Sequence, residues 1–154
     1  MRKNLFVKVS GDLSRSVNFI EYLRVVTRDY FTVICVGGGT QINEAFSKMG
    51  IVPSPHGQMG RELPSFELRQ IARDVLEKNQ SDLQDTLASL GINAVVIIPV
   101  LDLGSVLCHV NGDEMVKTAY IGFDQLVVIT TEDRVERKIT EFFGLDKIMV
   151  ISFK

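Results

Sequence analysis

The sequence predicts a single α/β domain, a three-layer sandwich with a mostly parallel central sheet. Six short apolar runs recur along the 154 residues, and most of the stretches between them carry helix start and stop signals. The runs are apolar almost throughout, which is typical of parallel strands covered by helices on both faces. A composition of 45% hydrophobic and 23% charged residues suits one well-packed unit, so we expect residues 1–154 to form one domain.

The expected strands are, in chain order, LFVKVS at 5–10, FTVICV at 31–36, AVVIIP at 94–99, SVLCHV at 105–110, QLVVIT at 125–130 and KIMVISF at 147–153. The connection around Asp102 and Gly104 is too short for a crossover helix, so it predicts an antiparallel hairpin. In such a sheet, ligands bind at the loops that leave the carboxyl ends of the strands. We therefore expect the strands ending at Ser10, Val36 and Val110 to be neighbours with their ends on one edge.

Helices are expected in the longer connections. Three starts are predicted by capping residues, each with a glycine at the expected end: Thr40 with Gly50, Ser81 and Gln84 with Gly91, and Thr130 and Asp133 with Gly144. Between Ser65 and Asn79, five apolar residues share one helical face: Leu68, Ile71, Ala72, Val75 and Leu76. We expect this face to lie on the sheet or against a second subunit.

Composition also excludes several classes of function. No apolar run approaches the ~18 to 20 residues of a membrane span, and the N-terminus lacks the apolar region of a signal peptide, so we expect a cytoplasmic protein. A net charge of -2 with scattered basic residues gives no footprint for nucleic acid, which favours small-molecule or protein partners. Cys35 and Cys108 lie in apolar stretches, which predicts buried, reduced thiols and no metal site.

A glycine-rich loop follows the second strand, in VICVGGGTQINEAF at 33–46. Gly37, Gly38 and Gly39 let the backbone approach a ligand, and the N–H groups that open the next helix favour an anion. A tight turn with glycines for packing explains the pattern equally well. Ile42 stands where a dinucleotide fingerprint needs its third glycine, and the Gly-Lys-Ser/Thr of a P-loop is absent, so the loop belongs to another scheme.

Two charged residues stand out beside this loop. Lys8 lies inside an apolar strand that ends before Gly11, where it either reaches an anion or a carboxylate, or extends to water from an edge strand. Asp113 follows another strand and the turn at Gly112. It either caps the next helix or positions a lysine near a transferring phosphoryl group.

Three motifs taken together resemble the amino acid kinase superfamily in order, spacing and strand context. They are KVSGDL at 8–13, VGGGTQIN at 36–43 and HVNGDEMVKTAYIGFDQLVVITTEDRV at 109–135. The first is similar to the KxSGE form of uridylate kinases, and the third to the NVNAD form of acetylglutamate kinases. The resemblance covers Leu5 to about Val135 and implies a carbamate kinase-like fold.

The resemblance implies roles for these residues. Lys8 neutralises the transferring phosphoryl group, Gly11 and the Gly37 to Gly39 loop donate N–H groups to it, and Asp113 holds Lys8. Such residue types suit phosphoryl transfer, which is mostly positioning and charge neutralisation. The resemblance also implies ATP and Mg²⁺ as cofactors, a small anionic partner and a homodimer.

Departures from the family concern the acceptor. By the resemblance Arg61, His109 and Asn111 are the candidate substrate contacts, but His109 replaces an acceptor-contacting Asn, which argues against acetylglutamate. Around PHGQMGRELP, Gly57 replaces a sugar-contacting Asp of uridylate kinases, whereas Arg61 parallels a carboxylate-binding Arg of acetylglutamate kinases. A solvated loop arginine explains Arg61 equally well, and we interpret His56 as a loop histidine.

The chain is short for this family. Arg134 stands where its nucleotide loop has Gly, most of the C-terminal nucleotide half is missing, and neither Lys138 nor Lys147 can be matched to its second lysine. Two hypotheses follow. One is a compact phosphotransferase acting on a carboxylate or phosphate acceptor, and the other a non-catalytic relative that binds a small anion or serves as an interaction or regulatory subunit.

Overall fold

The computed structural model describes residues 1–53 and 55–153 and has an α/β architecture. Its main sheet has five strands in the order β3-β2-β1-β6-β7, and every pairing in it is parallel. The bounds are β1 Lys3–Val9, β2 Tyr30–Val36, β3 Val95–Ile97, β6 Gln125–Thr130 and β7 Ile148–Ser152. β1 is the central strand, so the edge position considered for Lys8 is wrong.

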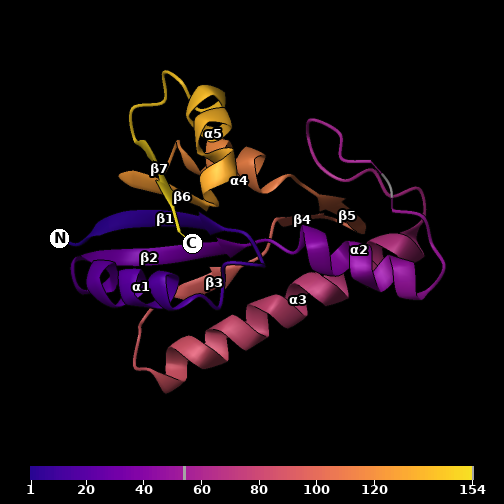
Figure 1. Ribbon diagram of the computed structural model, residues 1–154, viewed down its shortest axis with the longest axis horizontal. Helices are drawn as coiled ribbons and strands as arrows, with labels where there is room; N and C mark the ends of the chain where they lie inside the picture. The colour runs from indigo at the N-terminus through magenta and orange to yellow at the C-terminus, as the bar shows by residue number, and fades with distance from the viewer. Residues whose placement is uncertain (54, 154) are drawn as a thin grey trace.

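Helices cover both faces of this sheet and make three layers (Figure 1). On one face, α1 (Val17–Asp29) and the C-terminal half of α3 (Phe66–Ser89) pack on the sheet through Phe19, Leu23, Leu83 and Leu87. On the other, α4 (Gly112–Ala119) contributes Met115 and Val116, and α5 (Val135–Glu141) is followed by Phe142, which packs in the same cluster. Strands buried between two helical layers have no face for water, which explains their continuous apolar runs.

A smaller part of the molecule extends beyond the carboxyl ends of the strands. It holds α2 (Gly39–Lys48), the N-terminal half of α3, and the antiparallel pair β4 (Val100–Leu103) and β5 (Val106–His109), on the right in Figure 1. The predicted hairpin is therefore confirmed. The expectation that the strand ending at Val110 joins the main sheet is wrong, because β5 pairs with β4 in a separate two-stranded sheet.

The expected apolar face of residues 65–79 packs within the chain. Ala72 and Leu76 of α3 form a cluster with Ile42 and Phe46 of α2, and Leu68, Ile71 and Val75 pack against it. This face lies on α2, not on the main sheet. Ser65 caps α3 by accepting a hydrogen bond from the backbone N–H of Leu68 at 3.2 Å.

Three capping predictions are wrong in detail. Gly38, not Thr40, is the N-cap of α2, and the short helix η1 (Glu132–Arg134) begins after Thr131, not Thr130. Ser81 and Gln84 start no helix, because α3 continues through them as one element of 24 residues. The Gln84 side chain instead donates to Ala94 O and accepts from Val96 N, which ties α3 to the start of β3.

The expectation that both cysteines are buried, reduced thiols is confirmed in part. Neither Cys35 nor Cys108 forms a disulfide, and Cys35 is buried, whereas Cys108 is only half-buried. Burial raises the pKa of Cys35 to about 12, so its thiol stays protonated at neutral pH.

Among the described residues, no helix has the length and apolar character that crossing a membrane requires.

Candidate functional site

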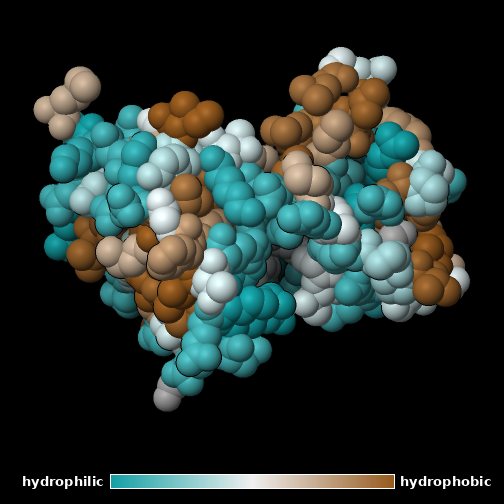
Figure 2. Space-filling view, turned by 90° about the horizontal axis from the view of Figure 1, so that it is seen from above, coloured by the Kyte–Doolittle hydropathy of each residue, from teal (hydrophilic) through white to brown (hydrophobic). Residues whose placement is uncertain are grey.

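A cleft of about 700 Å³ opens where the main sheet meets the smaller part. One wall comes from α2, α3 and the loop around His56 and Arg61, and the other from α4, η1 and α5. Figure 2 shows the recess between the two parts from above. All nine residues singled out from the sequence line this cleft: Lys8, Gly11, Gly37, Gly38, Gly39, Arg61, His109, Asn111 and Asp113.

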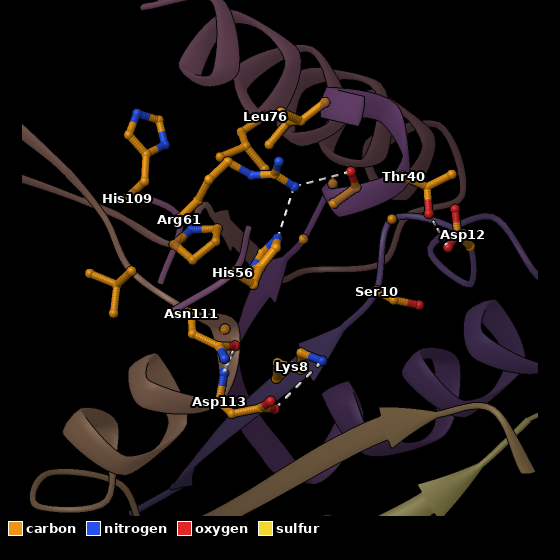
Figure 3. A pocket seen from close by; sticks show the side chains of 18 of the residues that line it. Lys8, Ser10, Asp12, Thr40, His56, Arg61, Leu76, His109, Asn111 and Asp113 are labelled. Carbon is orange, nitrogen blue, oxygen red and sulfur yellow. Dashed lines mark hydrogen bonds and ion pairs between the residues drawn. The ribbon is translucent and has the colours of Figure 1, made fainter. Parts of the chain in front are cut away.

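Lys8 projects from the centre of the sheet into the base of the cleft (Figure 3). Successive residues of a strand face opposite sides, so Lys8 shares with Phe6 the face covered by α4 and α5. Gly112 makes room for it, since a Cβ at Gly112 would lie 3.0 Å from Lys8 Cε. The side chain is only 14% exposed, and burial lowers the pKa of Lys8 more strongly than the nearby Asp113 raises it.

Asp113 lies between two lysines. Its Oδ1 is 3.7 Å from Lys8 Nζ, and its Oδ2 accepts a hydrogen bond from the ammonium of buried Lys138. Lys138 also donates to Glu141 Oε2 at 2.8 Å. Asp113 does not cap α4, because Asn111 is the N-cap and accepts from the N–H of Asp113 at 3.1 Å. The Asp113 carboxylate therefore holds two ammonium groups beside the cleft, that of buried Lys138 and that of partly buried Lys8.

The sequence does not distinguish Lys138 from Lys147 as a second lysine of the site. Lys138 follows Glu136 and Arg137 in a helix of mixed charge, where nothing distinguishes a buried lysine from a solvated one. Lys147, the other candidate, serves a structural purpose. Its ammonium donates to Tyr120 O at 2.8 Å and Phe123 O at 3.1 Å, and so satisfies carbonyls that follow the end of α4.

The glycines that follow β1 (Gly11) and β2 (Gly37 to Gly39) differ in how much space a Cβ atom would have. A Cβ at Gly11 would lie 2.5 Å from Gln41 Oε1 and 2.8 Å from Gly37 O, so this position has no space for a side chain. At Gly38 a Cβ would lie 2.8 Å from Asn79 Nδ2, which donates to Gly37 O. A Cβ at Gly39 would have nothing within 4 Å. The loops are thus packed closely against each other and against α3.

The N-terminus of α2 faces the cleft without a capping side chain. Its N-cap is Gly38, and Thr40 and Gln41 use their side chains to donate to Asp12, at 2.9 and 3.0 Å. Gln41 Oε1 is buried and has no hydrogen-bond partner among the described residues. The first N–H groups of α2 have no partner within the helix, so they can donate hydrogen bonds to an anion in the cleft.

Arg61 is a buried residue, not a solvated loop arginine. Its guanidinium donates to Asn43 Oδ1 at 2.8 Å, to Gly39 O at 3.4 Å and to His56 Nε2 at 2.8 Å. No carboxylate of the described residues pairs with it, and burial lowers the pKa of Arg61. Burying a charge without a counter-charge is costly, so the structure favours an anion beside Arg61.

His56 accepts the hydrogen bond from Arg61, because a guanidinium can only donate. His56 is therefore neutral, with its proton on Nδ1. Burial and the neighbouring Arg61 charge both lower the pKa of His56. This histidine supports the arginine from the loop and has no free Nε2 lone pair with which to act as a base.

His109 and Asn111 line the cleft at a different level from Lys8. Figure 3 shows the His109 ring pointing away from Lys8 and Asp113. Its Nε2 is buried and has no hydrogen-bond partner in the part of the chain that the structure describes, and burial lowers the pKa of His109. The backbone N–H of Asn111 donates to Met59 O at 2.8 Å, so Asn111 joins the loop before Arg61 to the start of α4.

The cleft as a whole is cationic. Its lining holds five cationic side chains and three carboxylates: Lys8, Arg61, Arg134, Arg137 and Lys138, with Asp12, Asp113 and Glu141. Among the residues described, no three His, Cys, Asp or Glu side chains are grouped so as to hold a metal ion. The arrangement suits an anionic ligand that is bound through ammonium, guanidinium and backbone N–H groups.

Comparison of the chain with protein-family models and with curated proteins finds no match.

Proposed function

We propose that this chain is an amino acid kinase-like protein that binds a small phosphate-like anion at the base of the cleft. The observation that carries the proposal is the chain of contacts from Lys8 through Asp113 to Lys138, which holds two largely buried ammonium groups beside the cleft. An anion that enters here replaces the water these cations have lost, and it does so where the effective dielectric constant is low.

The opposite wall of the cleft supports the same ligand class. The open N-terminus of α2 offers backbone N–H groups, and Arg61 supplies a buried positive charge with no carboxylate partner. Both favour negative charge. The resemblance in the three motifs points to the same residues, because all of the motif positions that it implies lie on this cleft.

Phosphoryl transfer to a carboxylate or phosphate acceptor is the second candidate function, and Lys138 favours it. The amino acid kinases use two lysines, and Lys138 is a second buried lysine on the same carboxylate as Lys8. In a transfer, ATP with Mg²⁺ supplies the phosphoryl group. Lys8 and Lys138 neutralise charge on its oxygens, and Asp113 keeps both ammonium groups in position.

Calorimetry with sulfate and inorganic phosphate tests the proposal on the wild-type chain and two lysine variants. We expect Lys8→Met to abolish binding, because it removes a cation from the base of the cleft. The matched control is Lys78→Met, since Lys78 is 74% exposed on α3 and does not line the cleft. Equal affinity in Lys8→Met and the wild type, or no binding of either anion by the wild type, contradicts the proposal.

Thermal unfolding gives an independent readout of the same variants. An anion at ~100 times its dissociation constant stabilises the native state by about 2.7 kcal/mol, and we expect this shift in the wild type and in Lys78→Met alone.

Formation of ADP from Mg-ATP with a panel of small carboxylic acids and phosphate esters separates the two candidate functions. Turnover that Lys138→Met abolishes supports phosphoryl transfer.

A further inference from the structure

The side of the cleft formed by η1 and α5 carries a row of charged side chains. Arg134, Arg137, Lys138 and Glu141 all line the cleft, and their spacing of three, one and three residues places them on one helical face. Lys138 and Glu141 belong to the cluster at the base, through Asp113. Arg134 lies about one turn before Lys138, toward the start of the segment, and Arg137 directly precedes Lys138.

The positive charge of these two arginines is not balanced inside the cleft. Within residues 1–53 and 55–153, Arg134 has one ion-pair partner, Asp133 at 3.8 Å, and both of these side chains are more than half exposed. Arg137 forms no ion pair with any of the described residues, although it lies near enough to Asp133 to help lower the pKa of that carboxyl. Exposed pairs of this kind are weak. The two guanidinium groups are therefore free to bind a ligand.

The three carboxylates of the cleft are already engaged by other groups. Asp12 accepts from Thr40 and Gln41, Asp113 from Lys138, and Glu141 from Lys138. None of them neutralises Arg134 or Arg137. The excess positive charge of the lining, five cations against three carboxylates, is therefore located partly at these two residues and away from the base.

We infer that the ligand of this cleft carries two separated anionic groups, and that Arg134 and Arg137 bind the second while Lys8 and Lys138 bind the first. This inference rests on the proposed anion site at the base. The helix rises about 1.5 Å per residue, and a 3-10 turn about 2.0 Å, so Arg134 lies roughly 6–8 Å along the axis from Lys138. A phosphate-like group joined by a short spacer to a carboxylate or to another phosphate has this length.

Calorimetry with ligands of different length tests the inference. The short probes are inorganic phosphate and phosphonoacetate, and the long ones are 5-phosphonopentanoate, 6-phosphonohexanoate and tripolyphosphate. We expect at least one long probe to bind the wild type at least tenfold more tightly than phosphonoacetate. In Arg134→Gln/Arg137→Gln this advantage is lost, while the affinity for inorganic phosphate changes less than about threefold.

A double variant with the same charge change controls for long-range electrostatics. Arg24→Gln/Arg28→Gln removes two positive charges from α1, which does not line the cleft, and we expect it to retain the preference for long probes.

Tripolyphosphate distinguishes two chemical sources of the second anionic group. If it alone shows the arginine-dependent gain, the group is a phosphate of a polyphosphate chain; a gain with the phosphonocarboxylates identifies a carboxylate.

Two results overturn different parts of this scheme. Equal loss of short and long probes in Arg134→Gln/Arg137→Gln, or no preference for length in the wild type, overturns the second subsite but leaves the base site intact. Unchanged affinity for inorganic phosphate in Lys8→Met overturns the proposed function itself. Failure of the second subsite is therefore detected with Arg134→Gln/Arg137→Gln and the long probes. Failure of the proposed function is detected with Lys8→Met and inorganic phosphate.

Discussion

Lys8 experiences two opposing electrostatic effects. Burial disfavours its ammonium form, the nearby Asp113 favours it, and burial is the stronger, so the pKa of Lys8 is lowered from 10.5. Lys138 adds a repulsive positive charge. An anion that binds beside Lys8 adds the counter-charge that this site lacks, so anion binding and protonation of Lys8 are linked.

This linkage predicts how sulfate binding depends on pH. Sulfate keeps its charge in alkaline solution, whereas Lys8 loses its proton at a pH below the usual 10.5. We expect the affinity for sulfate to fall as pH rises through the lowered pKa of Lys8. Calorimetry between pH 7 and 10 measures this trend, and an affinity that stays constant over the range contradicts it.

Folding stability responds to the same proton with the opposite sign. Because the pKa of Lys8 is lower in the folded chain, the unfolded chain binds more protons in the interval between the two values. The contribution of Lys8 to the free energy of unfolding therefore rises with pH there, while sulfate affinity falls. Lys8→Met removes both trends, which distinguishes Lys8 from other groups that titrate.

At the scale of the elements, the segment around residues 56–61 is fixed to the start of α4. Gly60 forms an isolated antiparallel bridge with Val110, and Asn111 N donates to Met59 O. Gly60 has φ +151°, and a Cβ there would lie 2.1 Å from His109 O. Only glycine permits this approach of two backbones, and the approach places Arg61 over the cleft.

Gly60→Ala is therefore expected to lower the free energy of unfolding by about 1–3 kcal/mol, the usual cost of overpacking, and to weaken sulfate binding by displacing Arg61. Gly122→Ala is the control, because a Cβ at Gly122 would have nothing within 4 Å, and it should cost less than about 0.5 kcal/mol. Urea denaturation measures both. Similar costs for the two variants would mean that the segment adapts to the new side chain.

The main sheet could be predicted from the sequence because its strands are buried on both faces and read as apolar runs. The departure of β4 and β5 from it could not. Val100 N donates to Ile98 O and Val110 N to Pro99 O, so the chain turns at Ile98–Pro99 and continues in a second sheet. The capping box at Ser81 was misleading because Gln84 bonds residues 94 and 96, contacts that depend on the tertiary fold.

The candidate site was predictable where its residues follow strands, and less so elsewhere. Lys8 and the glycines are unusual against their apolar surroundings, so they stand out in the sequence. Lys138 does not, because its burial depends on how α5 and Phe142, the residue that follows it, pack on the sheet. The same applies to Arg134 and Arg137, whose position on the cleft depends on how η1 follows β6.

At the scale of the whole molecule, the fold joins a parallel sheet to a smaller part that closes one side of the cleft. The lining is mostly glycine, polar and charged residues, and its aliphatic members are Ile42, Leu76, Pro99 and Val110. No Phe or Tyr of the described chain lines it. Sites for a planar base are usually apolar and aromatic, so these walls suit phosphate groups better than adenine.

We therefore predict that phosphate-like anions bind this chain more detectably than Mg-ATP does. Inorganic phosphate or sulfate needs only the ammonium, guanidinium and N–H groups around Lys8, Lys138 and α2, all of which face the cleft. The adenine of Mg-ATP gains little from walls without Phe or Tyr side chains. The bound Mg²⁺ also neutralises part of the phosphate charge that the cations of the cleft attract, so the complex binds less tightly than a free anion. Calorimetry with each ligand at the same ionic strength measures the order of affinities. Tight Mg-ATP binding in the wild type that is lost in Lys8→Met would reverse the order and make a compact kinase the better description.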